Sequence, residues 1–225
     1  MTSPINDRDT GAFTAPEPRA TSFMDWFHVN SRWVGIGAVA VAIAAVVAWY
    51  VPHQKALASE NADKMLLSAK QSLSSGNTQL AESDLRKVAD RYAGTPAGTE
   101  AGLLIGQVHL ERGDAPGAVT YLQELVKKTG SGPNAAAAHG LLADALMQSN
   151  KPADAAVEYD RAASATTMPN EKAMLQSKSG YAFMAAGKTA EARKVFQALA
   201  SQPESQGLAQ EARERLGELE GAAKS

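Results

Sequence analysis

Apolar and polar residues along most of the chain follow the period of amphipathic helices, and the same pattern returns at a longer interval. Four stretches align without a gap, each starting 37 residues after the previous one: 74–85, 111–122, 148–159 and 185–196. Each stretch has a Gly or Asn near its start, an Ala five residues later and a large apolar residue four residues after that. Gly and Asn tolerate the left-handed conformation that ends many helices. The pattern therefore predicts a row of helix-turn-helix hairpins.

Four columns of equivalent residues predict how these helices pack. The turn column is Gly76, Gly113, Asn150 and Gly187. Small residues lie seven positions before the turn (Ala69, Gly106, Ala143, Gly180) and five after it (Ala81, Ala118, Ala155, Ala192), and large residues follow at Leu85, Leu122, Tyr159 and Phe196. Small residues on both helices let the backbones approach closely, while the large residue fills the space beside them. The apolar face left on each hairpin must be covered by the next hairpin, which is the principle of a solenoid. Glu158 lies off these columns, so we expect it at the surface.

The composition agrees with an all-α fold. Hydrophobic residues make up 44% of the chain but aromatic residues only 6%, and alanine, which supplies much of the difference, loses little entropy in a helix. One further period reaches Gly217 in a helix whose outer face is charged. We therefore predict a solenoid of about four hairpins over residues 62–221, closed by a C-terminal capping helix.

One segment is too apolar for a solenoid surface. Residues 33–51 contain no charged residue, and a helix of that length nearly spans the hydrocarbon core of a bilayer, about 30 Å thick. Aromatic residues stand at both ends, where the headgroup zone favours them. The segment is interpreted as one transmembrane helix. A core helix and a cleaved signal peptide are the alternatives, the second because 56–58 (Ala-Leu-Ala) matches a cleavage pattern.

The transmembrane interpretation divides the chain into four parts. Residues 1–21 are predicted to be a disordered tail, 22–32 a juxtamembrane or interfacial segment, 33–51 the transmembrane helix and 54–225 the repeat domain. Basic residues on the two sides of the helix are balanced, so the positive-inside rule does not decide the orientation. A short tail before the helix and a large domain after it are typical of a signal anchor, which would place the domain outside the cytoplasm.

The columns resemble those of the tetratricopeptide repeat, in which small residues occupy the eighth and twentieth positions and a large residue the twenty-fourth. The usual repeat has 34 residues, and the three extra residues here lengthen the connections between hairpins. Pro96, Pro133 and Pro169 fall in those connections, near the starts of the next helices, where proline is tolerated.

The combination of segment 25–56 and the repeats is similar to the ancillary subunit family of the Sec translocon. An aromatic pair, a polar Asn, one membrane helix and an aromatic exit precede the repeats in both. The resemblance implies a single-pass protein of the bacterial inner membrane with a cytoplasmic N-terminus and a periplasmic domain. It also implies the SecYEG translocon, a periplasmic chaperone and unfolded clients as partners. The repeats alone also resemble the Tol-Pal-associated cell-division coordinator, so a scaffold in envelope assembly or division is the alternative.

No catalytic or cofactor motif is found in the sequence. The net charge of −2 offers no basic field for nucleic acid, and the absence of cysteine excludes thiolate metal sites and disulfides. His109 and His139 fall at packing positions, where we expect partial burial and a local hydrogen bond rather than metal binding. No nucleophile elbow, phosphate loop or glycine fingerprint is present. The sequence predicts neither an enzyme, nor a bound cofactor or metal, nor a small-molecule substrate.

The remaining candidate for function is a surface. In such repeats, the second, fifth, ninth and twelfth positions of the first helices line the concave groove. The groove residues predicted in this way are Leu66, Lys70, Leu103, Gln107, Leu110, Asp144, Tyr181 and Met184. This mixture of apolar and polar groups suits extended or partly unfolded chains, or the apolar helix of a partner. It lacks the cluster of basic residues that a C-terminal carboxylate would need.

Overall fold

The computed structural model of the chain describes residues 31–202 and 205–222. The predicted tail, 1–21, and nearly all of the predicted juxtamembrane segment, 22–32, lie outside the described residues. The chain divides into two compact units, Met1–Gln54 and Lys55–Ser225.

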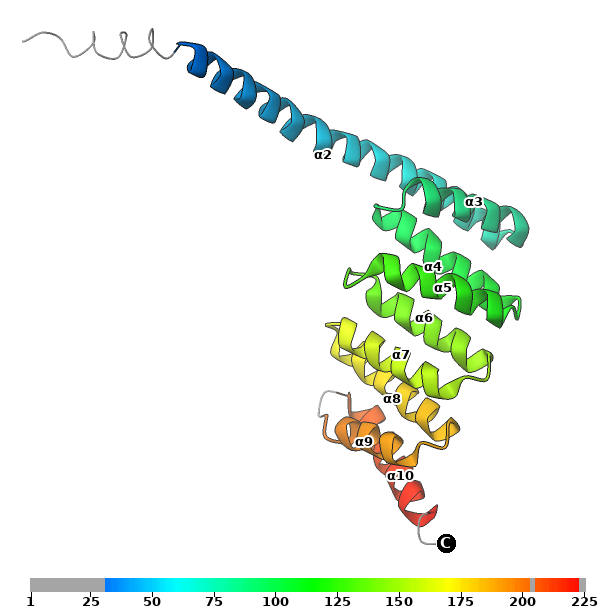
Figure 1. Cartoon of the computed structure of the whole chain (residues 1–225). Helices are drawn as coiled ribbons and strands as arrows, with labels where there is room; N and C mark the ends of the chain where they lie inside the picture. Colours follow the sequence, from blue (N-terminus) through cyan, green and yellow to red (C-terminus); the bar gives the residue numbers. More distant parts are fainter. Residues whose placement is uncertain (1–30, 203–204, 223–225) are drawn as a thin grey trace, which may run out of the picture. The chain divides into compact units, whose positions relative to one another are not determined.

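The described residues form helices joined by short connections, without strands, as the sequence predicts. In chain order the helices are α2 Ser31–Ser74, α3 Thr78–Arg91, α4 Pro96–Glu111, α5 Ala115–Thr129, α6 Ala135–Gln148, α7 Pro152–Ala165, α8 Pro169–Ala185, α9 Thr189–Ala200 and α10 Gln206–Ala222. From α3 to α10 each helix packs on its neighbour in the chain (Figure 1). The four predicted hairpins are the C-terminal part of α2 with α3, α4 with α5, α6 with α7, and α8 with α9.

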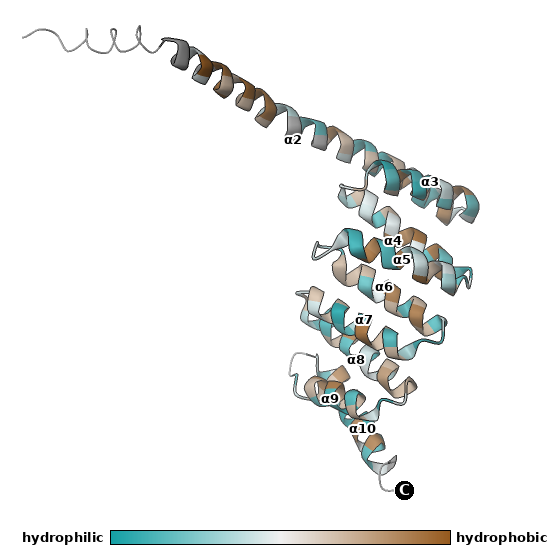
Figure 2. Cartoon of the chain, viewed as in Figure 1, coloured by the Kyte–Doolittle hydropathy of each residue, from teal (hydrophilic) through white to brown (hydrophobic). Residues whose placement is uncertain are grey.

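The first unit contains the N-terminal part of α2, which is brown for apolar residues in Figure 2. Its large apolar side chains are 52 to 69% exposed: Ile36, Val39, Val41, Ile43, Val46, Val47, Trp49 and Tyr50. Within the described residues, no helix has both the length and the apolar character needed to cross a membrane. The side chains of residues 33, 34, 38 and 51 lie outside the description, so the predicted transmembrane segment stays a prediction.

The turns of the hairpins have the predicted backbone conformation. The φ angles are positive at Gly76 (78°), Gly113 (75°), Asn150 (55°) and Gly187 (70°). Asn150 is the one residue other than glycine with a positive φ among the described residues. The turn column therefore ends each first helix in the left-handed region, which allows the chain to reverse within a few residues.

The small and large columns are buried as predicted. The relative exposure is 0% at Ala81, Ala118, Ala155 and Ala192, and between 0% and 4% at Leu85, Leu122, Tyr159 and Phe196. A Cβ atom added to Gly106 would lie 2.4 Å from Cδ2 of Leu122, and one added to Gly180 would lie 2.7 Å from Cζ of Phe196. In the second and fourth hairpins the large side chain of the second helix thus occupies the space that a side chain on the first helix would need.

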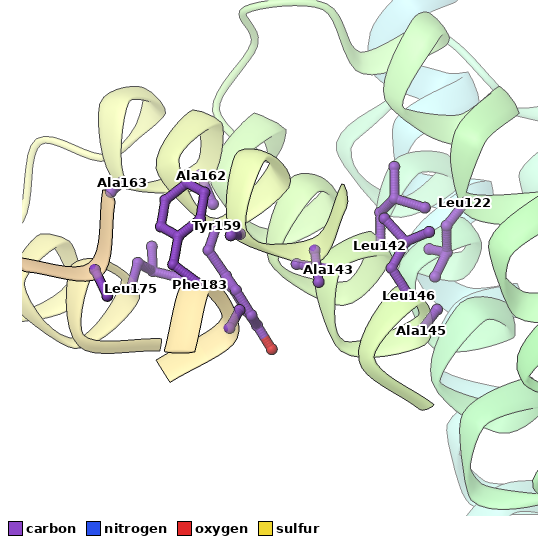
Figure 3. Packing of buried hydrophobic residues seen from close by; sticks show 14 of the residues in the cluster. Leu122, Leu142, Ala143, Ala145, Leu146, Tyr159, Ala162, Ala163, Leu175 and Phe183 are labelled. Carbon is purple, nitrogen blue, oxygen red and sulfur yellow. The ribbon is translucent and has the colours of Figure 1, made fainter. Parts of the chain in front are cut away.

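Two core clusters run through the repeat unit. One joins Leu66 and Ala69 of α2 with residues of α3 and α4, and the other extends from Ala118 of α5 to Leu219 of α10. Figure 3 shows part of the second cluster, where Leu122 of α5 meets Leu142 and Leu146 of α6. Each hairpin therefore buries its outer face against the next, as a solenoid requires.

The outer face of the first hairpin differs from the equivalent faces of the later ones. The third, seventh and tenth positions of the second repeat, which lie in α4, are Ala101, Ile105 and Val108, all between 0% and 3% exposed. The same positions of the first repeat, which lie in α2, hold Lys64, Ser68 and Gln71, all of which are exposed. The face of α2 that a preceding hairpin would cover is therefore polar.

At the other end, α10 has the charged outer face that the sequence predicts. Gly217 is exposed and would have no atom within 4 Å of an added Cβ, whereas Ala212 and Leu219 on the inner face are 0% and 8% exposed. The helix covers the last hairpin with its apolar side and presents Glu214 and Glu218 to solvent. It acts as the predicted cap of the solenoid.

The expectation that Glu158 is a free surface residue is wrong. Its side chain is 12% exposed, accepts from Arg161 at 2.5 Å and lies 2.6 Å from Nδ1 of His139. The repeat period places Glu158 off the small column but does not reveal that α6 brings His139 to it. Burial of this pair explains why a change at Glu158 should cost more than an ordinary surface substitution.

Gly106→Ala and Gly217→Ala make a matched test of the small column. Both changes gain the same helix propensity, about 1 kcal/mol, but the new methyl group at residue 106 overlaps Leu122 and the one at residue 217 meets open space. We expect the free energy of unfolding of Gly106→Ala to be lower than that of Gly217→Ala by about 1–3 kcal/mol. Denaturant midpoints measure the difference. Equal midpoints would mean that the helices are not in this register.

Candidate protein-interaction groove

The predicted groove residues come from the first helices of the hairpins. Leu66 is 5% exposed and belongs to the core, so it offers little surface to a partner. Four others are partly buried apolar or aromatic residues that pack against the second core cluster: Leu103, Leu110, Tyr181 and Met184. The polar positions are Lys70, Gln107 and Asp144, all at the ninth position of a repeat and all partly or fully accessible. Their binding role stays a prediction.

The ninth-position residue of most hairpins bonds to the next first helix. Nζ of Lys70 on α2 lies 2.5 Å from Oε1 of Glu100 on α4. Nζ of Lys178 on α8 lies 3.0 Å from Oδ1 of Asp144 on α6. These charges neutralise each other along the groove instead of facing solvent alone.

Asp144 is also tied to the core. The Tyr159 hydroxyl on α7 donates to Oδ1 of Asp144, and the Lys178 ammonium lies 5.3 Å from the centroid of the same ring. Burial, together with the neighbouring Asp144 carboxylate, raises the pKa of Tyr159 well above its usual range. The hydroxyl therefore remains a donor, and Asp144 is chiefly a link between three helices.

Tyr181 is held at the last junction in the same way. Its hydroxyl donates to Glu211 of α10 and accepts from Nε of Arg215 at 3.0 Å. The guanidinium of Arg215 lies 5.3 Å from the ring centroid, and Phe196 meets the ring edge-on at 5.6 Å. Burial and the bond to Glu211 raise the pKa of the Tyr181 hydroxyl. The capping helix thus binds the hydroxyl group of a residue that was predicted to line the groove.

The junction between α4 and α6 lacks such a link. Nε2 of Gln107 donates to Glu111 of its own helix at 2.9 Å. The facing positions on α6 are Ala137 and Leu141, which have no polar side-chain group. The middle of the groove is therefore its least polar part, with Leu103 and Leu110 on one side and Leu141 on the other.

A pocket opens beside this region, between α2, the start of α3 and α4. It is lined by Lys70, Leu73, Ser74, Thr78, Leu104, Gln107, Val108 and Glu111. Two of these lining residues, Lys70 and Gln107, are predicted groove residues. Leu73, Leu104 and Glu111 were not among the predicted groove residues, although Leu73 lies at the twelfth repeat position, which was expected to face the groove.

The two histidines of the repeats have the local partners expected from the sequence. Nδ1 of His109 lies 2.8 Å from Oδ2 of Asp114, and its ring stacks on Tyr121 with centroids 6.2 Å apart. His139 pairs with Glu158, and both histidine side chains are 15% exposed. Over the described part of the chain, no group of three or more His, Cys, Asp or Glu side chains is arranged to hold a metal ion.

A polar cluster that was not predicted from the sequence links the first two hairpins. Glu82 of α3 accepts from Arg86 at 2.9 Å and from Arg112, which follows α4. The bond to Arg86 and the nearby Arg112 charge hold the pKa of Glu82 below its ordinary value. The cluster joins consecutive hairpins, and Glu82, Arg86 and Arg112 line an open pocket there together with Thr78, Gln79 and Ser83.

The repeats define a class of protein, the helical-repeat scaffold, and comparison with known proteins gives the family. A family model described as the tetratricopeptide repeat-like domain matches residues 24–221. The chain therefore belongs to the tetratricopeptide repeat-like domain family. Folds of this class are typically non-enzymatic scaffolds that bind other proteins. A search of curated proteins finds no match.

Solved structures of tetratricopeptide-like repeats have a similar fold. A protein of Podosopora anserina described as a kinesin light chain, with nearly identical TPR-like repeats, gives a TM-score of 0.52 at 18% identity, covering 72% of this chain and 95% of that one. A single-substitution variant of it gives a TM-score of 0.52 at 19% identity, covering 72% and 94%. BtubC (BKLC) from P. vanneervenii gives 0.58 at 16% identity, covering 86% and 84%. These likenesses concern the fold alone.

Asp144→Ala and Gln107→Ala compare two residues at the same repeat position. Removing the Asp144 carboxylate leaves the Tyr159 hydroxyl, in a residue only 4% exposed, without its acceptor, which should cost about 1–3 kcal/mol. Gln107 is exposed and bonds within its own helix, so its loss should change stability by no more than about 0.5 kcal/mol. Thermal or denaturant unfolding measures both. Equal effects would refute the structural role of Asp144.

Proposed function

We propose that the chain is a membrane-anchored protein-interaction module, an accessory subunit of the Sec translocon that helps periplasmic chaperones with translocated proteins. Its concave groove would hold newly emerged or partly unfolded segments. In this proposal residues 33–51 span the bacterial inner membrane, the N-terminus is cytoplasmic and residues 54–225 are periplasmic. The chain would act by binding proteins, without catalysis.

The observation that carries the proposal is the internal pairing of the groove's charges. Lys70 pairs with Glu100, and Lys178 with Asp144, so these cations are already occupied by carboxylates of the groove itself. The accessible remainder includes partly buried apolar side chains such as Leu110 and Met184. A groove of this kind gains affinity from apolar burial, at about 25 cal/mol per Å², and unfolded segments are the partners that expose apolar side chains.

Two further observations support the anchor. The large apolar side chains of the N-terminal part of α2 are exposed, for example Val41 at 69% and Trp49 at 67%. Large exposed apolar patches mark interaction or membrane sites. The family match begins at residue 24, before the apolar segment, so the matching family shares more than the repeats. Anchoring would raise the local concentration of the groove near an emerging chain.

The groove is tested with a reduced, unfolded client and the full chain in lipid nanodiscs. We expect Leu110→Ala combined with Met184→Ala to weaken binding about tenfold, the loss of about 1.4 kcal/mol of apolar contact. Val157→Ala is the matched control, because Val157 is an apolar residue of the second helix α7 that is 41% exposed. Affinity should change little between low and moderate salt. Isothermal titration measures each affinity.

Three results would count against the apolar groove. If salt abolishes binding and the substitutions at Leu110 and Met184 leave the affinity unchanged, the affinity comes from charges. Equal losses for the groove variant and the Val157 control would place the binding surface elsewhere. The absence of client binding would favour the alternative, a scaffold in envelope assembly or division.

Membrane topology is tested with single cysteines, which are simple to introduce because the chain has none. With an impermeant thiol reagent on intact spheroplasts, we expect labelling at Ser225→Cys and none at Ser3→Cys. The reverse result would invert the proposed orientation. A mature protein that begins at Ser59 would show instead that residues 33–51 belong to a cleaved signal peptide.

A further inference from the structure

The pocket between α2 and α4 has an apolar lining and an acidic edge. Leu73, Leu104 and Val108 supply its apolar side chains, and Glu111 is the last residue of α4. Val108 is 3% exposed, whereas Leu73 and Leu104 are partly accessible. An aliphatic side chain of a partner would therefore be covered on several sides here.

Two cations near Glu111, one in the pocket lining and one next to it in the chain, are engaged with other carboxylates. Lys70, which lines the pocket from α2, lies 2.5 Å from Glu100. Arg112, the next residue in the chain, donates to Glu82. Among the described residues Glu111 forms no ion pair, and its hydrogen-bond partner is the neutral amide of Gln107.

Glu111 is also unfavourable for the helix that carries it. The C-terminal end of a helix carries a partial negative charge, which favours Lys or Arg and disfavours a carboxylate. Helix stability therefore does not account for an acidic residue at the end of α4. A cation supplied from outside would neutralise both Glu111 and the helix end.

We propose that this pocket recognises protein segments in which a large aliphatic residue is adjacent to a lysine or arginine. The aliphatic side chain lies on Leu73 and Leu104, and the cation pairs with Glu111. This inference rests on the proposed function, because it names the class of segment that one part of the groove selects. A nucleic acid or an anionic lipid headgroup would bring a phosphate against Glu111 and is disfavoured for that reason.

The test compares three labelled peptides that are identical except for the residue next to a single leucine: lysine, serine or glutamate. Fluorescence anisotropy with the full chain in a non-ionic detergent gives their dissociation constants at low salt. We expect the lysine peptide to bind about threefold or more tightly than the glutamate peptide, with the serine peptide between them. The ratio should shrink at high salt, because an exposed ion pair is screened.

Charge reversal supplies the decisive comparison. Glu111→Lys should invert the order of the lysine and glutamate peptides, and it should leave the fold intact because lysine suits a helix C-terminus. Glu220→Lys is the matched control: Glu220 is exposed near the end of α10, and the order of the peptides should be unchanged. Leu73→Ser should weaken all three peptides by a similar factor.

The outcomes separate this inference from the proposed function. If unfolded clients bind but Glu111→Lys leaves the order of the peptide affinities unchanged, the proposed preference of the pocket is wrong and the proposed function of the groove stands. If Glu220→Lys inverts the order as well, net charge rather than the pocket decides the preference. If neither clients nor peptides bind, both the proposed function and this inference fail.

Discussion

The close approach of the two helices within each hairpin is the constraint on which the rest of the structure depends. At Gly106 and Gly180, Leu122 and Phe196 occupy the volume that a side chain would need. Each contact fixes the distance between the two backbones and the register at which they meet. Because small and large residues recur at these positions every 37 residues, the hairpins stack in one repeated arrangement, and the equivalent positions of the first helices form one continuous surface.

A stack of this kind must close its two ends with polar faces, and this chain does so by substitution within the columns. Lys64, Ser68 and Gln71 replace the buried residues found at the same positions of α4. At Gly217 the small column continues into α10, but no second helix covers it. The interior columns thus specify how the hairpins associate, and the altered columns specify where that association stops.

The sequence was sufficient to predict the hairpins because their packing depends on backbone proximity, which small and large residues record directly. The turn residues, with positive φ at Asn150 as well as at the glycines, follow from the same period. The polar links between hairpins were not predicted, because they depend on where long side chains reach rather than on residue size. Glu158 shows the error that results: its position in the period suggested solvent, whereas His139 covers it.

These missed links nevertheless have a regular spacing. Lys70 to Glu100 and Tyr181 to Glu211 are both 30 residues apart, and Asp144 to Lys178 is 34. A separation of 30 residues is one 37-residue repeat minus about two helical turns, and a separation of 34 residues is one repeat minus about one turn. Pairs at these separations therefore connect neighbouring first helices along the groove. A search for opposite charges at these separations would have found the two ion pairs from the sequence.

The spacing also explains why the groove is a poor site for charged ligands although it contains many charged residues. A cation at the ninth position stabilises the stack only if the next helix supplies a carboxylate, and a pair formed in this way has little charge left for a partner. In the proposed function, recognition would depend on residues that the stack does not use. These are the partly buried apolar side chains around Gln107, and a carboxylate such as Glu111 whose neighbouring cations are already bound. Under this proposal, the selectivity of the groove would be determined by the groups that the solenoid leaves unpaired.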